Sequence, residues 1–103
     1  MKLDIDDLRE RLPPLYSQEA EADPHVYACF RLPGTDRRWY VMEGEPDGGD
    51  YLFSGFAVGA GRDEFRRFRL SELVAIRNLF DQPVERDLNF QEGRLTDVIP
   101  APE

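Results

Sequence analysis

The sequence predicts an α+β domain: an antiparallel meander sheet of four to five strands, one covering helix and a short N-terminal helix. Three observations predict it. Four strand-like runs follow one another, and Gly-, Pro- and Asp-containing segments of hairpin length separate them. Apolar residues alternate within the runs, which leaves one apolar sheet face. A segment with helical spacing follows and can cover that face.

Length and charge narrow the class of protein. The chain has 103 residues, which suits a single domain over residues 1–103. Its formal net charge of −8 argues against a general binder of nucleic acid or of anionic membranes. The single Cys29 can form no internal disulfide, and no apolar run approaches the ~20 residues that span a bilayer. We expect a cytoplasmic protein with no membrane partner.

The first element predicted is a short amphipathic helix. Apolar residues recur at near-helical spacing across residues 3–12, and Asp4 or Asp6 can cap the first turn. Pro13 and Pro14 end the helix because proline lacks an amide donor. The polar and acidic residues that follow predict a loop leading into the sheet.

The four predicted strands span residues 25–32, 37–45, 50–58 and 64–70. The turns between them contain the residue types that tight hairpins favour. In the third strand, either of two alternating sets can face the core: Leu52, Phe56 and Val58, or Tyr51, Phe53 and Ala57. One face of this sheet needs a cover.

The predicted cover is a helix that begins at Ser71, whose hydroxyl can cap it, and runs to about Phe80. Its apolar side would carry Leu73, Ile76, Leu79 and Phe80. Alternation over residues 84–90 predicts a fifth strand or an extended edge segment. A short turn is expected over residues 95–98, and Pro100 and Pro102 argue against a terminal strand.

Five short strings carry a resemblance to a known family. They are the Leu-Pro-Pro-Leu-Tyr string at 12–16, the Trp39–Tyr40 pair, and residues 50–55, 70–73 and 83–88. In this order they resemble a family of short bacterial proteins known as a domain of unknown function, over nearly the whole chain. The resemblance implies an association with plasmids, prophages and integrative elements. It carries over no catalytic residue.

Catalytic and metal-binding sets are poorly represented. His25 and Cys29 are the sole candidates for a Cys–His pair, and on one strand they would lie roughly 13 Å apart. One Cys and one His cannot build the usual four-ligand zinc site, and the turn at residues 59–61 lacks the Lys of a phosphate loop. The carboxylates within residues 43–50 fit a solvated hairpin tip or, alternatively, a cation site. We expect no enzyme, no metal and no cofactor.

The acidic surface predicts a protein partner. Carboxylates arrayed on a rigid sheet can imitate a phosphate backbone and so block a nucleic-acid-handling or defence protein of the host. The predicted partner-binding residues are Glu43, Glu45, Asp47 and Asp50, with Tyr40 and Tyr51 as aromatic anchors. The alternative interpretation of the same charge is solubility alone.

One basic segment supports a different function. Arg62, Arg66, Arg67 and Arg69 alternate with Phe65 and Phe68, a pattern that could meet phosphates and stack on bases. The alternative hypothesis is therefore a nucleic-acid-binding accessory protein that uses residues 62–69. A charged outer strand face that pairs with the neighbouring acidic hairpin explains the same arginines without any ligand.

Overall fold

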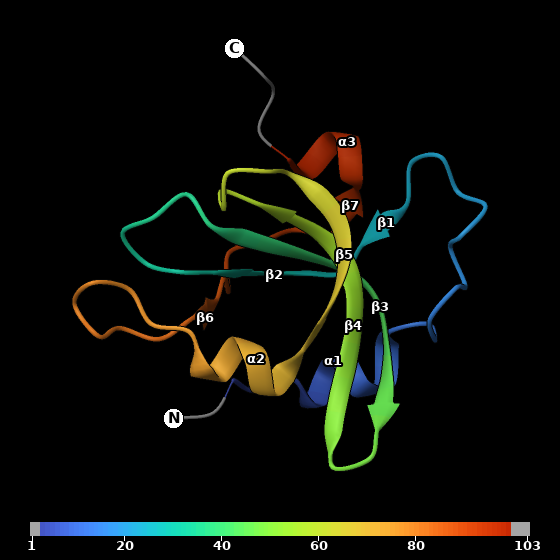
Figure 1. The fold of residues 1–103 in the computed structure, drawn as a ribbon. Coiled ribbons are helices and arrows are strands. Elements are labelled where there is room, and N and C mark those ends of the chain that lie inside the picture. The colour runs from blue at the N-terminus through green and yellow to red at the C-terminus, as the bar shows by residue number, and fades with distance from the viewer. Residues whose placement is uncertain (1–2, 100–103) are drawn as a thin grey trace.

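The computed structural model describes residues 3–99 and confirms the α+β class. Five antiparallel strands form one sheet in the order β5-β4-β3-β2-β6 (Figure 1). These strands are β2 (Ala28–Arg31), β3 (Arg38–Asp47), β4 (Asp50–Val58), β5 (Glu64–Arg69) and β6 (Glu85–Arg86). Strands β1 (His25–Val26) and β7 (Gly93–Arg94) form a second, two-stranded sheet. The helices are α1 (Asp6–Arg11), α2 (Leu70–Ala75) and α3 (Leu95–Val98).

The predicted strand over residues 25–32 is divided in two. Val26 packs on one face of the large sheet, whereas Ala28 packs on the other, so the alternation of a single strand is broken at Tyr27. The first part pairs with β7 and the second with β3. The other three predicted strands are confirmed as β3, β4 and β5, with β3 extending to Asp47.

The first core lies between the large sheet and two helices. Helices α1 and α2 lie on the same side of the sheet in Figure 1. The first core comprises Ile5, Leu8, Leu12, Ala28, Phe30, Leu32, Trp39, Val41, Tyr51, Phe53, Ala57, Phe68, Leu73 and Val84. Of the two alternatives for β4, the set with Tyr51 and Phe53 faces this core. The sequence predicted one covering helix, but α1 covers this sheet face together with α2.

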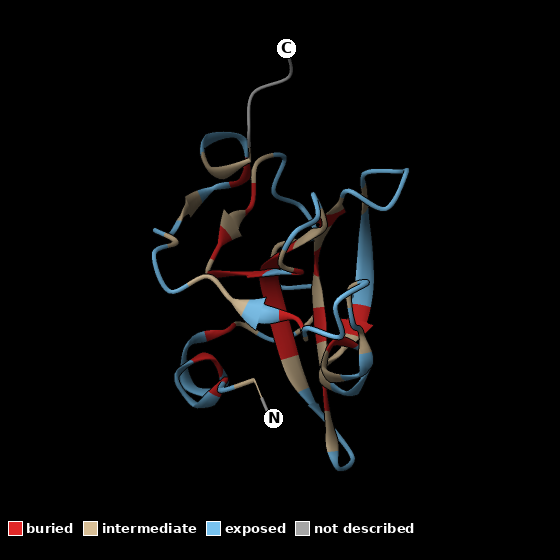
Figure 2. Cartoon of the chain, turned by 90° about the vertical axis from the view of Figure 1, so that its left-hand side faces the viewer, coloured by how far each residue is buried: buried red, intermediate tan, exposed pale blue. Residues whose placement is uncertain are grey.

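A second core occupies the opposite face, which corrects the expectation of one apolar face. It comprises Val26, Cys29, Tyr40, Met42 and Leu95, with Phe90, Val98 and Ile99 packed against it. The segment that contains β7 and α3 thus covers this side. Because β3 is covered on both faces, its residues from Trp39 to Gly44 are all buried. Figure 2 shows buried positions concentrated in the central strands and exposed ones at the loop tips.

The covering helix is shorter than predicted. It ends at Ala75, and Arg77 bridges to Pro83 across a loop. The side chain of Asn78 forms this loop: its Oδ1 atom accepts the backbone N–H groups of Phe80 and Gln82 at 2.8 and 3.0 Å. Asparagine competes in this way with helical hydrogen bonding. Leu79 and Phe80 consequently leave the predicted apolar side and face solvent.

A β-bulge sits at the middle of β3. The register with β4 shifts between Val41 and Glu43. Beside it, a Cβ on Gly55 would lie 1.9 Å from the carbonyl oxygen of Tyr40, so the two backbones approach closely because position 55 is glycine. The bulge turns Glu43 towards the loop that precedes β1.

Candidate functional site

Two of the predicted acidic residues accept hydrogen bonds from the backbone of the loop that follows Pro14. Glu43 is only 5% exposed, and its carboxylate accepts the backbone N–H groups of Tyr16 at 3.0 Å and Gln18 at 2.6 Å. Glu45 accepts the N–H of Leu15 at 3.0 Å. The expectation that Glu43 is an exposed surface charge is wrong, because the bulge buries it under this loop.

The other two acidic residues bind neighbouring elements. Asp47 forms an ion pair with Arg69. Asp50 accepts the hydroxyl hydrogen of Ser71 at 2.5 Å and the N–H of Ser71 at 3.2 Å, which satisfies a backbone donor at the start of α2. The hydrogen bond from the Ser71 hydroxyl is the main cause that lowers the pKa of Asp50. Ser71 thus lies within the first turn of α2 instead of capping it.

The two tyrosines predicted as anchors are not on the surface. Tyr40 is 3% exposed in the second core, and Tyr51 is 1% exposed in the first, where it stacks on Phe53. Burial raises the pKa of both phenols. The expectation of exposed aromatic rings at positions 40 and 51 is therefore wrong, because both faces of the sheet are covered.

The four predicted arginines do not form one patch. Arg67 and Arg69 alternate onto the face of the second core, whereas Arg66 shares the parity of Phe68 and points to the opposite face. The Arg67 guanidinium lies 4.5 Å from the centroid of the Tyr16 ring. Arg69 is bound to Asp47, and Arg62 is exposed in the loop before β5.

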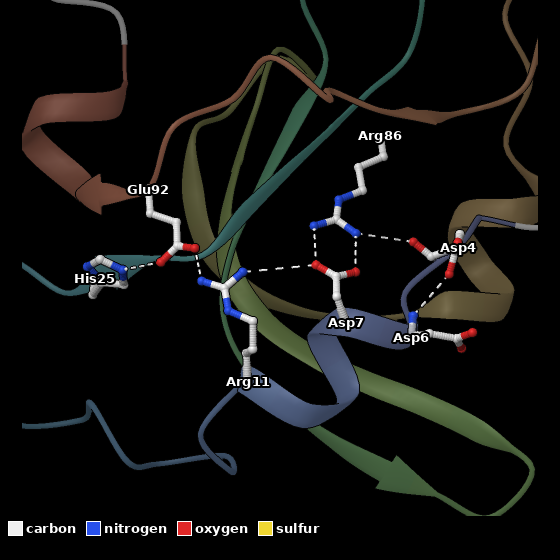
Figure 3. Close-up of polar contacts among 7 residues, drawn as sticks. All are labelled: Asp4, Asp6, Asp7, Arg11, His25, Arg86 and Glu92. Atoms are coloured by element: carbon white, nitrogen blue, oxygen red, sulfur yellow. Dashed lines mark hydrogen bonds and ion pairs between the residues drawn. The ribbon is translucent and has the colours of Figure 1, made fainter.

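A chain of ion pairs joins α1 to the C-terminal part of the fold (Figure 3). Arg86 of β6 donates to both carboxylate oxygens of Asp7, at 2.6 and 2.8 Å, and these bonds lower the pKa of Asp7. Glu92 binds both Arg11 and the Nε2 atom of His25, the latter at 3.0 Å. The polar partner of the His25 ring is thus Glu92.

The residues of the Cys–His hypothesis are not brought together. Cys29 lies in the second core with 1% exposure, whereas His25 lies at the surface beside Glu92. Within residues 3–99, no three His, Cys, Asp or Glu side chains gather in an arrangement that could hold a metal ion.

Sequence reasoning missed two adjacent apolar residues that are exposed in one loop. Leu79 is 100% and Phe80 84% exposed, and we call these two residues the apolar tip. Asn78 holds the loop to the body of the protein, because its Nδ2 atom donates to the carbonyl of Pro33 at 2.7 Å. The pattern Asn-x-x-Asp-x-Pro at 78–83 could have indicated this loop, because it is typical of a turn and not of a helix.

A groove lies at the base of the apolar tip. It has a volume of about 610 Å³ and lies between the chain start, α2 and the segment before β6. Its apolar lining includes Leu3, Pro33, Val74, Pro83, Val84 and Leu88. The apolar tip and this groove are therefore neighbouring apolar features of the surface.

Comparison with known proteins identifies one family. A family model described as "Protein of unknown function (DUF2958)" matches residues 5–99. No curated protein and no solved structure matches the chain. Among the helices described, none has the length and apolar character to cross a membrane.

Proposed function

The chain belongs to the DUF2958 family of proteins of unknown function, and we propose that it is a non-enzymatic interaction protein that binds another protein through its apolar tip. The carrying observation is the full exposure of Leu79 and the near-full exposure of Phe80. An aromatic side chain buries 150–250 Å² in an interface, at roughly 25 cal/mol per Å². A partner pocket that takes both residues would gain several kcal/mol.

The loop that carries the tip is ordered before any partner binds. Besides the bonds from Asn78 to Phe80 and Gln82, the N–H of Asn78 donates to the carbonyl of Gln82 at 3.0 Å. Asp81 adopts a φ of 60°, which closes the turn. A preordered loop loses little conformational entropy on binding, so more of the contact energy appears as affinity.

The proposed partner is a basic, nucleic-acid-handling or defence protein of the host cell. The net charge of −8 supports this, because an acidic protein attracts a basic surface and speeds their encounter. Asp47 at the hairpin tip remains partly accessible despite its ion pair. The association with mobile elements that the sequence resemblance implies would fit an inhibitory, anti-defence role, and the free Cys29 supports a cytoplasmic setting.

A comparison of immobilised variants tests this function. We would capture proteins from the host with the wild type, with the double variant Leu79→Ser/Phe80→Ser and with Phe65→Ser. Phe65 is 58% exposed and lies on β5, outside the tip and its groove, so it controls for the loss of an exposed apolar residue. We expect one protein bound by the wild type and by Phe65→Ser, and at least about tenfold less of it on the double variant. Equal capture by the double variant contradicts the proposal.

A second candidate function is nucleic-acid binding along β5. The favouring observation is the pair of partly exposed rings, Phe65 and Tyr16, which line a groove of about 340 Å³ together with Arg67. Such rings can stack on bases, and the guanidinium can meet a phosphate. A gel shift at low salt tests it: single-stranded DNA or RNA should be retarded by the wild type and not by Arg66→Ala/Arg67→Ala.

A further inference from the structure

Strand β5 forms one outer edge of the large sheet. It pairs with β4 along all six of its residues, and within residues 3–99 no strand pairs with its other side (Figure 1). The outward N–H and C=O groups of such an edge can accept a further strand. An extended peptide that binds there gains main-chain hydrogen bonds, and its side chains add specificity.

The edge carries cations that the protein does not neutralise. Six of the arginines, including Arg69, form ion pairs with carboxylates. Arg62, Arg66 and Arg67 have no such partner among the described residues, and all three are exposed. Arg9, Arg37 and Arg38 also lack such a partner among the described residues, but they lie elsewhere. Arg66 and Arg67 thus place two cations without an ion-pair partner on the open six-residue edge of a chain of net charge −8.

We propose that β5 accepts an extended acidic segment of a partner protein as an added antiparallel strand. The segment would carry two adjacent acidic residues followed by an aromatic residue. This surface is distinct from the apolar tip, and the proposal does not depend on the tip.

The alternation of side chains along β5 determines which residues the added segment should carry. Arg66 and Arg67 point to opposite faces, so adjacent residues of an added strand, which also point to opposite faces, can each reach one guanidinium. Directly opposed residues of opposite charge stabilise a strand pair. In the antiparallel direction, the next residue of the added strand lies opposite Phe65. That ring is 58% exposed and packs edge-on against Phe56, so an aromatic residue there extends an existing cluster.

The same geometry disfavours two other occupants. A second copy of this chain that paired through β5 in the register with Arg66 opposite Arg67 would bring like charges together, which costs energy. A nucleic acid strand presents its phosphates along one backbone, whereas the two arginines project to opposite faces of the sheet. A paired β-strand satisfies both arginines at once.

The test is a peptide titration. A fluorescent peptide of about eight residues would carry two adjacent glutamates and then a phenylalanine among threonines and valines. One comparison peptide replaces both glutamates by glutamine, and another places proline between the glutamates and the valines to block strand pairing. A single-stranded oligonucleotide of similar length is the third probe. We expect the parent peptide to bind at least about tenfold more tightly than any of the other three.

Protein variants locate the binding. Arg66→Glu/Arg67→Glu should abolish peptide binding, whereas Arg9→Glu, which changes an exposed arginine of α1, should retain it. Leu79→Ser/Phe80→Ser should also retain it, which separates this proposal from the function of the apolar tip. Amide NMR shifts on titration should be largest along β5. Absence of peptide binding, equal binding of the proline peptide, or preferential binding of the oligonucleotide would each overturn the proposal.

Discussion

The Oε2 atom of Glu43 lies 2.6 Å from the backbone nitrogen of Gln18, so a carboxylate in the sheet holds a loop 25 residues earlier in the chain. The side chain of Gln18 in turn donates to the carbonyl oxygens of His25 and Met42, both at 3.0 Å. In this loop, Tyr16 adopts a φ of 73°, a conformation that a non-glycine residue rarely adopts. Glu43 and Gln18 together attach this loop to β3.

Removing the Glu43 carboxylate should destabilise the protein. Glu43→Ala leaves the N–H groups of Tyr16 and Gln18 without their acceptor, at a cost of about 1–3 kcal/mol in the free energy of unfolding. Urea denaturation measures this loss. Glu10→Ala, which removes an exposed carboxylate of α1, is the control and should change stability by less than about 0.5 kcal/mol. Equal stability of the two variants would show that the loop does not depend on Glu43.

Gly55 should tolerate no side chain. A Cβ there would lie 1.9 Å from the Tyr40 carbonyl oxygen, so Gly55→Ala must separate β3 from β4 at the bulge and should cost about 3 kcal/mol or prevent folding. Gly49→Ala is the matched control, because no atom lies within 4 Å of its added Cβ. Thermal melts of both variants test the difference. A Gly55→Ala variant as stable as Gly49→Ala would disprove the close approach.

The Asp7–Arg86 pair should make stability depend on acid pH. Its hydrogen bonds lower the pKa of Asp7 below 3.8 in the folded protein, so the unfolded chain binds more protons as the pH falls towards that value. The stabilisation is present above the unfolded pKa and is lost as pH falls through the folded pKa. We expect the difference in Tm between wild type and Asp7→Asn to be largest near neutral pH and to shrink as the pH falls below the ordinary pKa of an aspartate. A difference that stays constant across this range would contradict the linkage.

Cys29 should be unreactive in the folded protein. Burial in the second core raises the pKa of its thiol to about 11, so the reactive thiolate is scarce at neutral pH, and reagents cannot reach it. A thiol-specific chromogenic reagent at about pH 8 should label the native protein more than about 100-fold more slowly than the urea-unfolded protein. Comparable labelling rates would indicate that the second core opens readily.

Asn78 should order the apolar tip without stabilising the whole fold. Asn78→Ala removes the acceptor of the Phe80 and Gln82 N–H groups, and both amides should exchange hydrogen at least about tenfold faster. Asn78→Asp keeps that acceptor but loses the donor to Pro33, so the two amides should be less affected than in Asn78→Ala. Global stability should fall by less than about 1 kcal/mol in either variant. Unchanged exchange in Asn78→Ala would mean that other contacts order the loop.

The meander was predictable because turn residues and alternation are local signals. Residues 50–58 show both, and β4 has these bounds. The helix over residues 71–80 was predicted wrongly because the apolar spacing of Leu79 and Phe80 fits a helix, whereas the decisive hydrogen bonds of Asn78 include one to Pro33, far away in the sequence. Spacing alone does not reveal such a partner.

The candidate site was less predictable than the fold. Glu43 has the character of a surface residue in the sequence, and its burial depends on a bulge that no local pattern indicates. The second core was unpredictable for a similar reason, since Tyr40 and Met42 are covered by residues from 90 onwards, which are distant in the sequence. The few apolar residues from 90 onwards do not indicate which face of the sheet they pack against.

The pairing of β1 with β7 has a consequence for the order of events during synthesis. His25 lies opposite Arg94, and the N–H of Leu95 donates to the carbonyl of Pro24 at 2.9 Å. Translation proceeds from the N-terminus, so the nascent chain can assemble the meander and the first core while the side of β3 that carries Tyr40 and Met42 is still bare. That surface stays open to aggregation or to a chaperone until residues 93–99 leave the ribosome and close it.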